Sequence, residues 1–101
     1  MKLSSILLEY KVDFKIERIS IGYTDYGSFY GIYLYAPPSK DNPYNNWKEK
    51  IRFYSDAKEF IKDLTGLDLP RNYSYEELDK IADALRKKGY DADHDDAMDV
   101  S

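Results

Sequence analysis

An alternation of apolar and polar residues in the first third of the chain constrains the fold most strongly. From residue 8 to residue 16 every second residue is apolar, and after Glu17 the apolar positions move by one residue to Ile19, Ile21 and Tyr23. Period-two alternation is typical of a β-strand with one buried face, and a one-residue change of phase indicates a β-bulge. We therefore predict a strand from about Asp13 onward, with a bulge near Glu17.

The segment before this strand fits two descriptions. Leu3, Ile6 or Leu7, and Tyr10 would share one face of a helix that follows a serine N-cap, whereas the alternation could also extend the strand backward. We predict a short N-terminal helix, with a strand as the open alternative.

A hairpin is predicted next. The sequence TDYGS, residues 24–28, separates the first strand from FYGIYLYA, residues 29–36. A short loop with Asp and Gly between two β-rich runs indicates an antiparallel hairpin. We expect one face of its second strand to pack against helices and the other to present tyrosine rings. Alternation assigns Tyr30, Ile32 and Leu34 to one face and Phe29, Tyr33 and Tyr35 to the other.

The remaining chain predicts a loop, a third strand and two helices. Residues 37–47 contain three prolines and three asparagines, which favour a surface loop. A strand is predicted at residues 50–54, then a helix with Ser55 as N-cap and Gly66 at its end. The last helix begins with a capping box of Ser74 and Glu77 and ends before Gly89. The apolar stripes of the two helices are Ala57, Phe60, Ile61 and Leu64, and Leu78, Ile81, Ala82 and Leu85.

These elements predict one α+β domain over residues 1–89, with a short N-terminal helix, a three-stranded antiparallel sheet and two C-terminal helices. A chain of 101 residues has the length of a single domain, which we expect to be a monomer or a weak dimer. Residues 90–101 are expected to form an acidic, mobile tail. Ending the chain after Gly89 would then remove no core residue and cost at most about 1 kcal/mol of stability.

Cysteine content and charge narrow the function classes. The absence of cysteine excludes a disulfide framework and a thiolate zinc site, and no signal peptide or membrane span is recognisable, so a cytoplasmic protein is expected. Residues 1–55 hold eight Lys and Arg against six Asp and Glu, whereas residues 56–101 hold seven against thirteen. The acidic C-terminal half argues against direct binding of nucleic acid, which requires a basic stripe, and favours a basic protein partner.

No segment carries a catalytic or metal-binding signature. The tail sequence DADHDD lacks the glycine of a calcium loop, and a single histidine, His94, is too few ligands for a zinc site. A histidine in a mobile tail also cannot act as an oriented base for a serine nucleophile. We therefore predict a protein without enzymatic activity, metal ion or cofactor.

Acidic and aromatic side chains are the candidate partner-binding residues. Carboxylates on the last helix and tail would meet a basic surface, although a solvated helix face and a frayed end account for the same residues. Tyrosine is enriched in protein interfaces, although packing under the helices is the alternative. The candidates are Glu76, Asp79, Asp83, Asp91, Asp93, Asp95 and Asp96 among the acids, and Tyr26, Tyr33, Tyr35 and Trp47 among the rings.

The layout and charge of the chain resemble those of the small phage anti-CRISPR proteins that inhibit Cas9. The resemblance follows the order of elements over the whole chain, from KLSSILLEY and FKIERISIGYT through FYGIYLYA, KIRFY and SDAKEFIKDLTG to SYEELDKIADALRKKG. It implies a DNA mimic whose carboxylates enter the basic groove in which Cas9 reads its recognition motif.

The expected function is therefore a phage-encoded, non-enzymatic inhibitor that binds a basic nucleic-acid-handling protein, such as a Cas nuclease, in the host cytoplasm. One alternative is an immunity protein or antitoxin that neutralises a nuclease toxin. Another is a phage accessory or assembly protein that uses a tyrosine-rich sheet.

Overall fold

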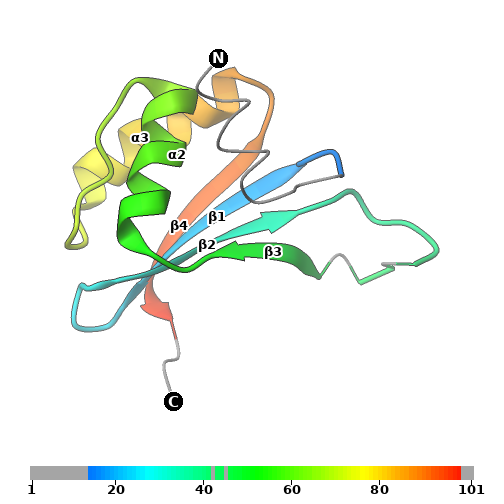
Figure 1. Cartoon of the computed structure of the whole chain (residues 1–101), viewed down its shortest axis with the longest axis horizontal. Helices are drawn as coiled ribbons and strands as arrows, with labels where there is room; N and C mark the ends of the chain where they lie inside the picture. The colour runs from blue at the N-terminus through cyan, green and yellow to red at the C-terminus, as the bar shows by residue number, and fades with distance from the viewer. Residues whose placement is uncertain (1–13, 42, 45, 99–101) are drawn as a thin grey trace.

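A computed structural model describes residues 14–41, 43, 44 and 46–98. The elements in chain order are β1 (Arg18–Thr24), β2 (Phe29–Tyr35), β3 (Trp47–Ile51), α2 (Tyr54–Thr65), α3 (Tyr75–Lys87) and β4 (Asp91–Met98). This arrangement confirms the α+β class (Figure 1). The predicted N-terminal helix falls within residues 1–13, which lie outside the described residues.

The sheet has four strands in the order β3-β2-β1-β4. β1 pairs with β2 and β2 with β3 in antiparallel fashion, as predicted, but β4 runs parallel to β1. The prediction of a three-stranded antiparallel sheet is therefore wrong in strand number and in direction. Since β3 and β4 both run parallel to β1, the chain must cross the sheet between them, and α2 and α3 make this crossover on one face (Figure 1).

The fourth strand is formed by residues that the sequence assigned to a mobile tail. Asp91–Met98 pairs with β1 from Arg18 to Thr24. Ala92 lies opposite Ile19 and is 2% exposed, so the expectation that this segment contributes nothing to the core is wrong. Aspartate is rare in strands, and the pairing partner lies at the other end of the sequence, which is why local patterning concealed the strand.

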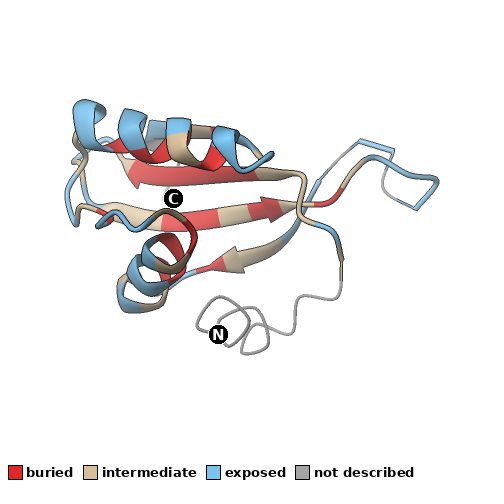
Figure 2. Ribbon diagram, turned by 90° about the horizontal axis from the view of Figure 1, so that it is seen from above, coloured by how far each residue is buried: buried red, intermediate tan, exposed pale blue. Residues whose placement is uncertain are grey.

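The core lies between the sheet and the two helices. β1 and β2 contribute Ile19, Ile21, Ile32 and Leu34, all fully buried. The predicted helix stripes are confirmed, because Ala57, Phe60, Ile61, Leu64, Leu78, Ile81, Ala82 and Leu85 are the buried residues of α2 and α3. Figure 2 shows the sheet-facing sides of the helices buried and their outward sides exposed. The opposite face of the sheet carries neither helix (Figure 1).

Three of the four predicted helix ends agree with the structure, including the end of α3 at Lys87, before Gly89. Gly66 ends α2 in a left-handed conformation with φ of 76°, and Ser74 Oγ accepts a hydrogen bond from the backbone N–H of Glu77. The N-cap of α2 is Phe53 rather than Ser55, and its side chain makes no capping hydrogen bond. The prediction of a strand at residues 50–54 is shifted accordingly, because pairing with β2 places β3 at Trp47–Ile51 and Tyr54 already begins the helix.

A β-bulge changes which rings of β2 reach the core. β1 begins only at Arg18, so the phase change near Glu17 marks the start of the strand, and the register shifts instead between Gly22 and Tyr23. This shift pairs Tyr23 with Phe29, and Phe29 packs against the core, contrary to the simple alternation.

Tyr30 falls in the bulge, between the paired residues of β2. Its ring contacts Tyr33 and lies under the Lys50 ammonium.

Candidate partner-binding surface

Asp91, Asp93 and Asp95 of β4 form a row on the sheet face opposite α2 and α3. Asp93 accepts hydrogen bonds from Ser20 Oγ at 2.6 Å and from the Arg18 guanidinium, and both donors alternate with the core residues of β1. Alternation along a strand puts Asp91 and Asp95 on the same side as Asp93, about 6.6 Å apart along the strand. Asp91 and Asp95 are exposed, and the eight residues of β4 include four aspartates and no lysine or arginine. β4 is also the last strand on its side of the described sheet.

Positive charge next to this row comes from Arg18. Its hydrogen bond to Asp93, and the nearby negative charges of Asp93 and Asp91, raise the pKa of the Arg18 guanidinium, while burial works in the opposite direction. The pair is more than one third exposed, with side-chain exposures of 37% and 42%, so solvent weakens it. Arg18 therefore offsets negative charge mainly at the centre of the row, at Asp93.

The acidic candidates of the last helix lie on the neighbouring element. Glu76, Asp79 and Asp83 are exposed on α3, which packs against β4. Asp83 lies 3.7 Å from Lys87 Nζ, and Asp79 Oδ1 lies 3.7 Å from His94 Nε2 of β4. Asp96 is exposed, and its charge reaches Tyr73. The fold thus gathers all seven predicted carboxylates on two adjacent elements.

His94 is part of β4 and packs against residues at and just before the start of α3, so it does not lie in a mobile tail. Its side chain is 8% exposed. Nδ1 lies 3.0 Å from the Tyr73 hydroxyl, and the ring of Tyr75 stands edge-on to the imidazole at 5.4 Å. Burial, with smaller effects from Asp96 and other neighbours, raises the pKa of Tyr73, so its hydroxyl stays protonated at neutral pH. The contacts of His94 therefore tie the acidic strand to the helix layer.

The aromatic candidates divide into a cluster and an isolated ring. Tyr33 contacts Trp47 at 5.4 Å, and Trp47 is 45% exposed. Tyr35 lies under the Arg18 guanidinium at 5.0 Å. Tyr26 lies in the turn between β1 and β2, is 91% exposed and takes no part in these ring contacts.

Three members of this surface were missed by sequence reasoning. Lys50 lies over Tyr30 and Tyr33 at 4.0 and 5.1 Å from the ring centroids, and Arg18 connects Tyr35 to Asp93. Arg18 alternates with the predicted core residues Ile19 and Ile21, so the period-two pattern could have assigned it to this face. The placement of Tyr30 depends on the bulge and gave no sequence signal.

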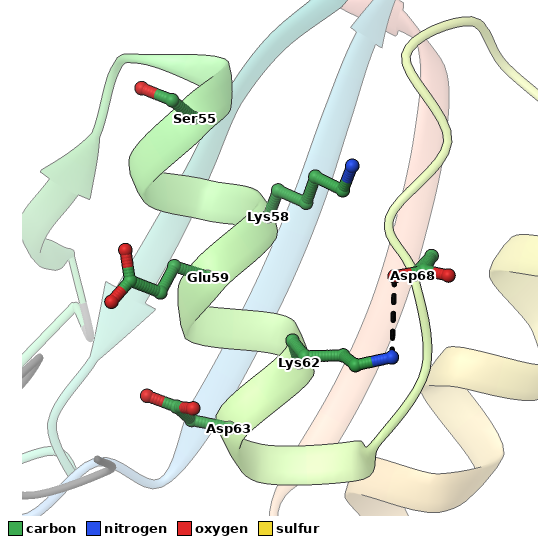
Figure 3. Close-up of a pocket in the computed structure, with 6 residues that line it drawn as sticks. All are labelled: Ser55, Lys58, Glu59, Lys62, Asp63 and Asp68. Carbon is green, nitrogen blue, oxygen red and sulfur yellow. Dashed lines mark hydrogen bonds and ion pairs between the residues drawn. The ribbon is translucent and has the colours of Figure 1, made fainter.

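An open cavity of about 530 Å³ lies along α2 and the loop that follows it, apart from the acidic and aromatic candidate residues (Figure 3). Lys58 and Lys62 extend toward Asp68, with Lys62 Nζ 3.4 Å from Asp68 Oδ1, while Glu59 and Asp63 point to the other side of the helix. Both partners of the ion pair are more than half exposed. These mixed charges define no preference for an anion or a cation.

Within the described ranges, no three His, Asp or Glu side chains are grouped so that they could hold a metal ion. No helix among the described residues is long and apolar enough to cross a membrane. Comparison of the chain with models of protein families, with characterised proteins and with solved structures found no match.

Proposed function

We propose that this protein is a non-enzymatic inhibitor that binds a basic, nucleic-acid-handling protein through the acidic surface of β4 and α3. The observation that carries the proposal is the row of aspartates on β4, in a strand without a lysine or arginine. A row of carboxylates on a rigid strand presents negative charge at regular intervals, which complements a surface built to hold a nucleic-acid backbone.

The aromatic cluster supports a contact surface beside the acidic row. Trp47 and Tyr33 combine large rings with polar atoms, and such residues are frequent energetic centres of protein interfaces. In the proposed complex the acidic row steers association, and the rings contribute to the lifetime of the bound state.

The proposed partner class is a bacterial defence nuclease of the Cas9 type, and the proposed source is a phage acting in the host cytoplasm. The same acidic surface would serve an immunity protein or an antitoxin, which differ only in the nuclease that they neutralise. The exposed rings favour assembly with other phage proteins as a second candidate.

The proposal is tested by DNA cleavage with a Cas9-type nuclease and by the association rate of the two proteins at several salt concentrations. Asp91→Asn, Asp95→Asn and Asp96→Asn together should slow association about tenfold at low salt. The difference should shrink toward half-molar salt, where the Debye length is about 4 Å.

A matched control removes the same charge elsewhere. Asp25→Asn, Asp41→Asn and Glu59→Gln change exposed acids outside α3 and β4 and should leave inhibition unchanged. Equal slowing by both triple variants would show that net charge alone matters and would contradict the proposed surface. Inhibition of a nuclease toxin, with none of a Cas9-type enzyme, would favour the immunity-protein alternative.

A further inference from the structure

A second cavity, about 280 Å³ in volume, lies where the end of β3, the start of α2 and the loop before α3 meet the hairpin. It shares no residue with the acidic surface. Of the described residues that line it, the charged ones are Arg52 and Arg71, and the uncharged ones are Ser28, Phe29, Phe53, Tyr54 and Asn72. The cavity is therefore a positively charged site in a protein whose net charge is −4.

Arg71 is held in place by an aromatic ring. Its guanidinium lies 4.4 Å from the centroid of the Tyr54 ring. That ring is fixed in turn, because its hydroxyl donates to the Leu69 carbonyl and its edge packs on Phe29 at 5.7 Å. A guanidinium that stacks on a fixed ring keeps its N–H groups directed along one plane, which lowers the entropy lost when an anion binds.

Neither arginine is neutralised within the described part of the chain. The ion pairs found there within 4.0 Å join other residues and leave the guanidinium groups of Arg52 and Arg71 without a carboxylate partner. Paired arginines recognise phosphate and carboxylate through two parallel hydrogen bonds each. Positive potential from the start of α2, where Phe53 supplies no side-chain cap, adds to their charge.

The cavity also offers a ring surface and neutral polar groups. Phe53 is 69% exposed, which is unusual for a phenylalanine and leaves its ring free to stack on a planar ligand. Ser28 and Asn72 supply hydroxyl and amide groups. A volume of about 280 Å³ is just below the usual range for sites that enclose drug-sized molecules, so it fits a phosphate with part of one ring.

We propose that this cavity binds the phosphate of a small molecule with a planar ring, of the nucleoside monophosphate class. Arg52 and Arg71 hold the phosphate, and Phe53 stacks on the ring. The residues of this site differ from those of the proposed inhibitor surface, although the charge of Arg52 reaches Tyr33 of that surface.

The test is a titration of the full-length protein with adenosine monophosphate, inorganic phosphate and adenosine, followed by backbone amide NMR in low-salt buffer. Adenosine monophosphate should give saturable shifts at residues 28, 52–54, 71 and 72, inorganic phosphate weaker ones, and adenosine none. Arg52→Gln and Arg71→Gln should each weaken binding about tenfold or more, the scale of one lost charge-assisted hydrogen bond.

Two further variants make the result specific. Lys88→Gln removes one positive charge at an exposed position outside the cavity and should leave affinity unchanged. Arg71→Lys keeps the charge but removes the planar fork, and should also weaken binding. Absence of saturable shifts with adenosine monophosphate, or equal losses in Lys88→Gln and Arg71→Gln, would overturn the proposal. Equal affinity for inorganic phosphate and adenosine monophosphate would overturn the role given to Phe53.

Discussion

Removal of β4 should lower the free energy of unfolding several times more than removal of a solvated tail would. A chain that ends after Gly89 loses the burial of the Ala92 methyl group, worth about 0.8 kcal/mol, and the hydrogen bond between Tyr73 and His94, worth about 1 kcal/mol. It also uncovers one side of Ile19 and Ile21, both fully buried. Exposure of roughly 50 Å² of their apolar surface, at about 25 cal/mol per Å², would cost about 1.2 kcal/mol.

With the ladder hydrogen bonds of β4 taken to offset the ordering entropy of its backbone, the total loss is about 3 kcal/mol. Urea denaturation monitored by Trp47 fluorescence measures this difference directly. The control is the variant Asp91→Asn, which keeps the strand, removes an exposed charge and should change the unfolding free energy by less than about 0.5 kcal/mol. A loss below about 1 kcal/mol in the truncated chain would refute the packing of β4 described above.

Three smaller perturbations test other parts of the fold. Gly66→Ala should cost about 1 kcal/mol in thermal or urea denaturation, because φ is 76° while no atom lies within 4 Å of the added methyl group, and a neutral result would contradict this conformation. Tyr73→Phe should cost about 1 kcal/mol through loss of the contact with His94 Nδ1. In a double-mutant cycle, the stability lost by the double variant with His94→Phe should differ from the sum of the losses of the two single variants. Burial, with smaller effects from Tyr54 and Glu77, raises the pKa of Tyr23 far above its ordinary value of 10.0. The unfolded state therefore releases this proton first, so the contribution of Tyr23 to stability should be constant well below pH 10 and fall as the pH rises through 10, and Tyr23→Phe should flatten that decline.

Features specified by neighbouring residues could be predicted from the sequence. The stripes of α2 and α3, the Ser74 cap and the left-handed Gly66 depend on spacings of three or four residues or on one backbone angle. The hairpin of β1 and β2 depends on a short turn between two alternating runs. The acidic candidates could also be identified from the sequence, because the charge of a side chain type is known without the fold.

The tertiary structure alone decided where those candidates lie. The aspartates of β4 stand in a strand because Ala92 and His94, at alternate positions, meet Ile19 and Ile21 of a strand formed more than sixty residues earlier. Likewise, Lys50 comes to lie over Tyr30 through the bulge at Gly22, and Arg52 and Arg71 meet at one cavity through the crossover of the helices. Local propensity cannot encode such contacts, since the free energy that stabilises a low-propensity strand comes from partners that only the folded chain brings within reach.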